Sequence, residues 1–175
     1  VTSVNPLLEA MGNAKTTRND NSSRFGRFVK MYVDSFGEVQ MCEMSTYFLE
    51  KSRVVLQPPE ERNFHIFYQM LAGVEEEVRQ LYHIRCDPKE YSFLRQAPQQ
   101  VAGVEDAQEW ATAVIPALDV LDIKQGTELM NHFVMLLSCT LLCGEICWDA
   151  NGPDSEEASC STPELLASFS DMLAV

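Results

Sequence analysis

The sequence has few basic residues for its length. Its 175 residues include 13 Lys and Arg against 26 Asp and Glu, which gives a formal net charge of −13 at pH 7. Proteins that bind nucleic acid through its phosphates need clustered Lys and Arg. The charge balance therefore excludes a generic nucleic-acid binder, and we expect no nucleic-acid partner. Hydrophobic residues make up 46% of the chain, a share typical of folded globular proteins, so one domain or a large piece of one is expected.

Long apolar runs are also absent. The longest, over residues 133–148, is interrupted by Ser138, Thr140, Gly144 and Glu145, whereas a membrane helix needs about 20 predominantly apolar residues. The first residues lack an initiator Met and lack the basic and apolar regions of a signal peptide. We therefore expect no membrane span, and we interpret both ends of the chain as cut ends.

The six cysteines contain no Cys-x-x-Cys pair, the spacing that indicates many zinc and redox sites. They are scattered among apolar neighbours, which favours reduced thiols in the cytosol over a disulfide framework. Cys139, Cys143 and Cys147 are spaced at four residues, so a thiol-based metal protein is one alternative. Gly144 is expected to end the helix before Cys147, which favours small core residues instead. A Gly-x-Ser-x-Gly motif is absent as well, so a hydrolase of that class has no support.

The hydrophobic pattern predicts a mainly α-helical protein with a small β-hairpin. Alternating Val, Met, Phe and Tyr residues over 27–33 and 38–44 enclose the turn residues 34–37. Before this hairpin, Asn5 and Pro6 predict the start of a short helix that extends to residue 11.

The rest of the chain shows apolar residues at helical spacing. The predicted helices cover residues 64–82, 110–121, 129–141 and 163–173. Asp122, with Gln125 three residues later, is expected to cap the third of these, and Thr162 the last. Pro116 is expected to kink or break the second. His65 is interpreted as a packed, hydrogen-bonded histidine, because its neighbours are apolar.

The polar loop 14–23 is the stretch most typical of a functional site. Together with Arg24, it brings amide, hydroxyl and guanidinium groups into a few residues just before a predicted strand. A hydroxyl can ligate Mg²⁺, amides can hold phosphate oxygens, and an arginine can lock the loop through a carboxylate. These groups suit a nucleoside triphosphate with its magnesium. Composition alone, however, favours a solvated loop with Asx and Ser turns.

Three blocks of the sequence resemble conserved blocks of the myosin motor domain. Residues 5–26, which end in Asn-Asp-Asn-Ser-Ser-Arg-Phe-Gly, are similar to the switch I region of that family. Residues 46–54 (Thr-Tyr-Phe-Leu-Glu-Lys-Ser-Arg-Val) and 61–73 are similar to two later blocks, in the family's order and spacing. Kinesins share Ser-Ser-Arg but continue with Ser-His, whereas this chain has Phe25 and Gly26. The resemblance is strong over residues 5–73 and thinner beyond them.

The resemblance implies specific roles in an intact motor that uses ATP with Mg²⁺. Ser23 would ligate Mg²⁺, Asn19 would contact the phosphates, and Ser22 would contact the γ-phosphate and help to place or relay a proton from the lytic water. Arg24 would form a salt bridge to the glutamate of switch II. Ser22 and Arg24 are thus the expected catalytic residues, and Asn19, Ser22 and Ser23 the expected nucleotide-binding ones.

The chain lacks the Gly-x-x-x-x-Gly-Lys-Ser/Thr motif that cradles phosphates. The Asp-x-x-Gly pattern at residues 34–37 lies in the predicted hairpin turn, where the family places no switch II. The resemblance therefore implies that residues 1–175 are a fragment of the P-loop NTPase (α/β) myosin motor fold: switch I, the central-sheet hairpin and helices of the upper 50-kDa subdomain. The P-loop and switch II would lie outside the chain, so Arg24 is expected to lack its partner carboxylate and the fragment to be inactive alone.

The implied partners are the actin filament, ATP and ADP, and the rest of the motor domain, with light chains or calmodulin on an absent neck. The implied location is the cytoplasm, on the cytoskeleton. The acidic run 75–77 would repel acidic actin, and only the loop near 150–161 is a hypothesis for a secondary filament contact. The alternative from another class is a degenerate myosin-like interaction module without ATP turnover.

Overall fold

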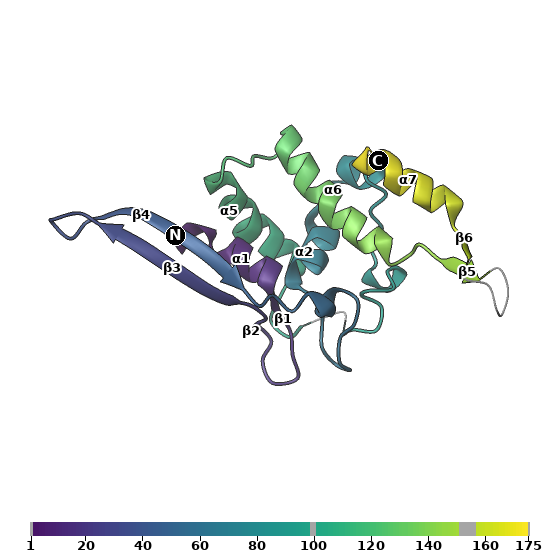
Figure 1. The fold of residues 1–175 in the computed structure, drawn as a ribbon, viewed down its shortest axis with the longest axis horizontal. Helices are drawn as coiled ribbons and strands as arrows, with labels where there is room; N and C mark the ends of the chain where they lie inside the picture. Colours follow the sequence, from purple (N-terminus) through teal and green to yellow (C-terminus); the bar gives the residue numbers. More distant parts are fainter. Residues whose placement is uncertain (1, 99–100, 151–156, 175) are drawn as a thin grey trace.

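Helix α2 (His65–Gly73) is the most enclosed element, because every residue from His65 to Leu71 is buried. The computed structural model describes residues 2–98, 101–150 and 157–174. Helices α1, α4, α5 and α6 lie around α2, and a two-stranded hairpin extends from this group (Figure 1). The remaining helices are α1 (Asn5–Gly12), α3 (Glu76–Leu81), α4 (Asp106–Glu109), α5 (Ile115–Val120), α6 (Glu128–Cys143) and α7 (Pro163–Leu173), with short 3-10 turns at Thr2–Val4, Lys51–Val54 and Pro88–Glu90. The fold class predicted from the sequence, mainly α with a small hairpin, is confirmed.

The core is built from the apolar faces that the helical spacing predicted. Phe67, Leu71, Val114, Leu118 and Leu141 are all buried and belong to one hydrophobic cluster. Burial of such side chains contributes about 1.5–3 kcal/mol each. The cluster therefore fixes α1, α2, α5 and α6 as one body, against which the polar loop after α1 is held.

Strands β3 (Gly26–Val33) and β4 (Val39–Tyr47) form the predicted antiparallel hairpin. Its turn is closed by Asp34, whose Oδ1 accepts hydrogen bonds from the N–H groups of Phe36 at 2.8 Å and Glu38 at 3.0 Å. Gly37 adopts φ +84°, a conformation that glycine reaches without a Cβ clash. Most hairpin side chains are exposed, including apolar ones such as Phe28 and Met31.

Helix α1 begins at Asn5 with Pro6 in its first turn, as predicted. The Asn5 side chain makes no cap, and its Oδ1 accepts a hydrogen bond from Arg27. The predicted cap of the helix over 129–141 is wrong. Helix α6 is capped by Thr127, whose Oγ1 accepts from the N–H of Met130 at 3.3 Å. Asp122 instead has φ +62° and ends the preceding turn, a conformation that Asp tolerates better than most residues.

Other predicted helices differ in their interiors. The stretch 64–82 is divided, because Val74 and Glu75 are extended between α2 and α3. Pro116 does not break its helix, because a π-helical turn (Trp110–Val114) precedes it and Ile115 donates its N–H to Trp110 O. This wider turn leaves room for the proline ring, which would otherwise meet the carbonyl four residues earlier. Thr162 does not cap α7 through its side chain, and its Oγ1 accepts from Cys147 N at 3.0 Å.

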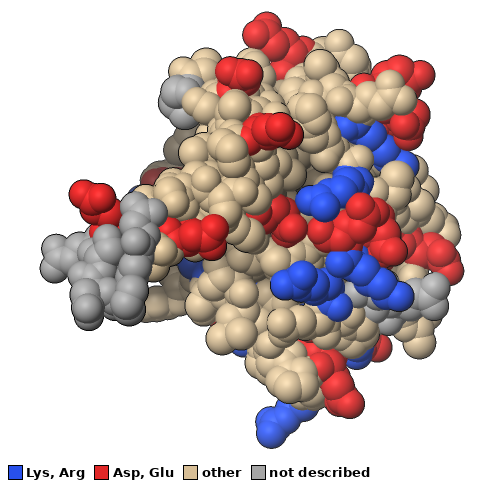
Figure 2. Space-filling view, turned by 90° about the vertical axis from the view of Figure 1, so that its right-hand side faces the viewer, with Lys and Arg blue, Asp and Glu red and all other residues tan. Residues whose placement is uncertain are grey.

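At the far end, β5 (Trp148–Ala150) pairs with β6 (Ala158–Cys160) and leads into α7. The loop near 150–161, the hypothesis for a secondary filament contact, falls partly outside the described residues. On the face around α7, Lys and Arg side chains lie among Asp and Glu rather than in a separate basic patch (Figure 2). Among the helices that the structure describes, none is both long and apolar enough to cross a bilayer.

Candidate nucleotide-binding loop

The four predicted site residues lie on or beside one short loop. Strand β1 (Asn13–Ala14) pairs with β2 (Ser22–Ser23), with Asn13 opposite Ser23 and Ala14 opposite Ser22. Residues 15–21 connect these strands and form the middle of the polar loop 14–23. Asn19 lies in the loop, Ser22 and Ser23 form its exit strand, and Arg24 follows. The structure thus brings together all four predicted residues.

Side chains within the polar loop hold its shape. Thr16 Oγ1 donates to Asn19 O at 3.1 Å and accepts from Asn19 N at 3.2 Å. Asn19 Oδ1 accepts from Asn21 N at 2.8 Å, which forms the Asx turn that the composition predicted. Lys15 and Asp20 form an ion pair of 2.6 Å. Because the carbonyl of the Asn19 side chain is engaged, its Nδ2 amide is the group left for a ligand.

The two serines differ in their surroundings. Ser23 is exposed and donates its hydroxyl hydrogen to Phe25 O at 3.0 Å, which leaves the oxygen lone pairs for another partner. Ser22 is half-buried, and its Oγ accepts from Arg24 Nη1 at 3.4 Å. A hydroxyl that donates inward suits a hard cation, because Mg²⁺ takes oxygen ligands and keeps several from phosphate and water. The hydroxyl oxygen of Ser23 can therefore supply one ligand to Mg²⁺, and only one.

Arg24 has a carboxylate partner within this chain that the sequence did not predict, and its pairing with the glutamate of switch II stays a prediction. Its Nε donates to Glu50 Oε2 at 2.6 Å, and the backbones also meet, with Glu50 N donating to Arg24 O at 3.0 Å. Glu50 lies directly after the 26–47 hairpin, so the antiparallel pairing of β3 and β4 carries it back to Arg24. Burial by itself would raise the pKa of Glu50, but the hydrogen bonds from Arg24 and Arg53 outweigh burial and hold the pKa below its usual value.

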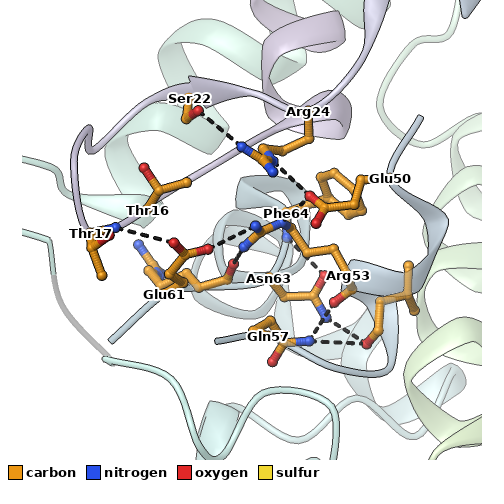
Figure 3. A network of polar contacts seen from close by, with 12 residues as sticks. Thr16, Thr17, Ser22, Arg24, Glu50, Arg53, Gln57, Glu61, Asn63 and Phe64 are labelled. Carbon is orange, nitrogen blue, oxygen red and sulfur yellow. Dashed lines mark hydrogen bonds and ion pairs between the residues drawn. The ribbon is translucent and has the colours of Figure 1, made fainter. Parts of the chain in front are cut away.

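Arg53 is the centre of a larger polar network around this pair (Figure 3). Its side chain is 2% exposed, and each of its three nitrogens donates to a different residue. Nε bonds Glu50 Oε2 at 2.8 Å, Nη2 bonds Glu61 Oε2 at 2.8 Å, and Nη1 bonds Arg62 O at 3.0 Å. Burial works against this charge, but the two carboxylates outweigh it and raise the pKa of Arg53.

The network also reaches the entrance of the polar loop. Glu61 Oε1 accepts from Thr17 N at 3.4 Å, and Arg62 N donates to Lys15 O at 3.0 Å. A further bridge pairs Ala14 with Phe64. Both ends of the polar loop are thus tied to residues 50–64, a segment far from it in sequence.

His65 contacts the polar loop through the side chain of Asn21. Asn21 Oδ1 accepts from Asn13 Nδ2 at 3.0 Å and lies 3.2 Å from His65 Nε2, so the hydrogen of this histidine is assigned to Nε2. Burial, with a smaller contribution from the charge of Arg62, lowers the pKa of His65 from 6.5 to about 4. The side chain is neutral near pH 7 and packed, as the sequence predicted, and its place at the loop makes it a support rather than a general base.

The cysteines do not build a metal centre in the part of the chain that the structure describes. Across those residues, no group of three or more His, Cys, Asp or Glu side chains lies close enough together to hold an ion. Helix α6 ends at Cys143, so Cys147 does not continue the face that holds Cys139 and Cys143. Burial raises the pKa of both of these thiols, which keeps them protonated and makes them poor ligands.

Comparison with known proteins gives the family. The Myosin head (motor domain) family matches residues 1–175, the whole chain. The chain belongs to this family. It is 45% identical to Myosin-4 of Saccharomyces cerevisiae over 74% of the chain, and 41% identical to Myosin-2A of Naumovozyma castellii over 83%. It is also 42% identical to the non-muscle myosin heavy chain of Drosophila melanogaster over 82%. The matched part spans only 7–9% of the length of these myosins.

The residues that hold the polar loop in place were not predicted from the sequence. Glu50, Arg53 and Glu61 were recognised only as members of conserved blocks. Glu50 and Arg53 stand three residues apart, a spacing at which opposite charges pair within one helical turn. This spacing is the one feature of the sequence that could have predicted their ion pair. Nothing local marks the link from Arg53 to Glu61 or from Glu61 to Thr17, because these contacts depend on how the segment folds back.

Proposed function

We propose that this chain forms one wall of the Mg-ATP site of an actin-based motor. The observation that carries the proposal is the polar loop, which presents an amide and two hydroxyls beside an anchored arginine, in a chain of the myosin head family. Residues 1–175 correspond to switch I, the central-sheet hairpin and the upper 50-kDa helices. The P-loop and switch II are supplied by other parts of the same motor.

Each residue of the loop has a role in this proposal. Asn19 donates its Nδ2 amide to phosphate oxygens. Ser22 contacts the γ-phosphate and holds the attacking water, and its half-buried hydroxyl relays the proton from that water. Ser23 offers its oxygen to Mg²⁺, which neutralises phosphate charge when bound. Arg24 fixes the exit of the loop, so the donors are aligned before the reaction, which is where such sites gain most of their catalytic effect.

Actin filaments, ATP and ADP, and the rest of the motor domain are the proposed partners, with the actin-bound head turning over ATP. Light chains or calmodulin would bind a neck outside this chain. The proposed location is the cytoplasm, on the cytoskeleton. No observation favours the degenerate interaction module. With one wall of the site only, the 175-residue chain alone should not hydrolyse ATP.

The test is the actin-activated ATPase of the complete motor head that contains this chain. Ser22→Ala, Ser23→Ala and Arg24→Ala should each lower kcat by about 100-fold or more, a loss typical of a removed transition-state contact. Ser35→Ala is the matched control, because Ser35 is an exposed serine in the hairpin turn. Its activity should equal that of the wild type.

Two outcomes would overturn the proposal. A wild-type head that binds actin and shows no turnover would instead make it an interaction module. A wild-type head that is active, with kcat unchanged in Ser22→Ala and Arg24→Ala, would show that this loop does not carry the chemistry.

A further inference from the structure

The polar loop is tied at both ends to one buried arginine. At the exit, Arg24 bonds Glu50, and Glu50 bonds Arg53 through the same Oε2 atom, at 2.6 and 2.8 Å. At the entrance, Arg53 bonds Arg62 O at 3.0 Å, and the N–H of Arg62 bonds Lys15 O at 3.0 Å. The path from Lys15 to Arg24 through Arg53 is therefore continuous. We call Arg24, Glu50, Arg53 and Glu61 the Arg53 clamp.

The pairing of strands does not fix the loop by itself. Strands β1 and β2 contribute two residues each, and a two-stranded pair so short has little stability of its own. The loop between them is exposed from Thr17 to Asn21. The Arg53 clamp supplies the missing restraint, because it connects the start and the end of the loop to the buried segment 62–64.

The charges of the Arg53 clamp balance. Two guanidinium groups face two carboxylates, and Glu50 is shared between Arg24 and Arg53. Because the hydrogen bonds keep the pKa of Glu50 below its usual value, the carboxylate stays ionised at any pH near neutral. Arg53 is almost fully buried, so its position is set by its three partners and not by solvent.

Lysine cannot replace Arg53 in this arrangement. The three donors of Arg53 leave a planar group in fixed directions and meet three acceptors on Glu50, Glu61 and Arg62. A lysine ammonium is a single point at the end of a flexible chain and cannot span these acceptors at once. The geometry requires a guanidinium.

We propose that Arg53 is a positioning residue for the polar loop, acting through Glu50 and Glu61 and touching no substrate itself. This inference rests on the proposed function, because the donors it aligns are those of Asn19, Ser22 and Ser23. The exit link through Glu50 lies in series with the entrance links through Glu61 and through the carbonyl of Arg62, and these two entrance links act in parallel. Once the exit link is broken, breaking the Glu61 link as well therefore releases the loop no further.

The series arrangement gives a sharp test in the complete motor head. Glu50→Gln and Glu61→Gln keep the side-chain shape and remove one ionic link each. Glu50→Gln should lower kcat by about tenfold, since small displacements of aligned groups cost this much or more, and Glu61→Gln by less, because the bond from Arg53 to Arg62 O still holds the entrance. Both should leave the KM for ATP within about twofold. The double variant should be no worse than Glu50→Gln alone, whereas independent effects would multiply.

Hydrogen–deuterium exchange of residues 15–24 is the second readout, and it needs no ATP turnover. Exchange in this segment should rise in Glu50→Gln, Glu61→Gln and Arg53→Lys. The control is Glu76→Gln, which alters an exposed glutamate 4.0 Å from Arg79 in helix α3. It should change neither exchange nor kcat.

The outcomes separate this inference from the proposed function. A wild-type head without ATPase activity, but with faster loop exchange in the variants, refutes the proposed function and supports the Arg53 clamp. An active wild-type head with unchanged exchange in all three variants overturns the clamp. Multiplicative losses in the double variant overturn the series arrangement, and a fall in melting temperature shared with Glu76→Gln would indicate a general loss of stability rather than positioning.

Discussion

The ion pair between Arg62 and Asp106 ties the segment just before α2 to the start of α4, and its removal should have a large effect on stability. Arg62 is 0% exposed, lies 3.6 Å over the ring of Tyr68, and donates from Nη2 to Asp106 Oδ2 at 2.7 Å. Asp106→Asn keeps the shape and removes the negative charge, which leaves a buried cation without its counter-ion. Removing one partner of a buried pair costs about 3–5 kcal/mol. The Asp106 side chain is 16% exposed, so we expect the lower end, about 3 kcal/mol.

The assay is hydrogen exchange of the α2 amides in the complete motor head. A loss of about 3 kcal/mol in local opening corresponds to exchange roughly 100-fold faster, because each 1.4 kcal/mol is a factor of ten. The matched control is Asp122→Asn, which alters an exposed carboxylate paired with Lys124. Exposed pairs contribute little, so α2 exchange should not change in the control.

A double replacement tests the physical reasoning further. Within the described residues, Nε and Nη1 of Arg62 and Oδ1 of Asp106 are buried without a hydrogen-bond partner. The pair is therefore incompletely satisfied, and Arg62→Met combined with Asp106→Leu should recover most of the stability lost in Asp106→Asn. If Asp106→Asn leaves α2 exchange within threefold of wild type, the argument from an uncompensated buried charge is refuted.

Two further predictions concern His65 and Gly73. His65 takes up a proton near pH 6.5 in the unfolded chain but only near pH 4 in the folded chain. Between these pH values only the unfolded state binds the proton, so the free energy of unfolding falls as the pH falls below 6.5. The loss is about 2 kcal/mol at pH 5. Histidine hydrogen exchange should report a pKa of about 4 for His65, and a value near 6.5 would contradict this. In Gly73→Ala, the new Cβ would clash with Trp110 Cδ1. Overpacking of about 1–3 kcal/mol should exceed the helix-propensity gain of up to about 1 kcal/mol. The head should melt at a lower temperature, whereas Gly26→Ala, whose nearest contact is 3.6 Å, should melt as the wild type does; a stabilised Gly73→Ala would refute the prediction.

The elements that could be predicted from sequence are those fixed by local chemistry. The alternation over 27–33 and the turn residues Asp34 and Gly37 specify the hairpin without help from the rest of the chain. Helix boundaries were less accurate where two signals compete. Asp122 and Thr127 are both good N-caps, and only the left-handed conformation of Asp122 decides between them.

The proximity of the candidate site residues could be predicted from the sequence, but their connections could not. Asn19, Ser22, Ser23 and Arg24 fall within six residues and match a family block, and their roles stay predictions. Nothing in the sequence indicated that Arg24 also pairs with Glu50, 26 residues further along the chain. The length of a hairpin and the pairing of its strands decide which residue after the second strand lies beside the start of the first. Residue spacing in the sequence does not specify this.

The hairpin also orders the events by which the chain folds. Pairing of β3 with β4 carries Glu50 back to Arg24 using contacts that are local along the chain, and an isolated hairpin closes within about 1–10 μs. The bond from Thr17 to Glu61 spans 44 residues and needs the segment after the hairpin to fold back as well. Contacts between distant residues form later, because closing the longer loop costs more entropy. The polar loop is therefore expected to be among the last parts of this chain to take its shape, although it stands near the beginning of the sequence.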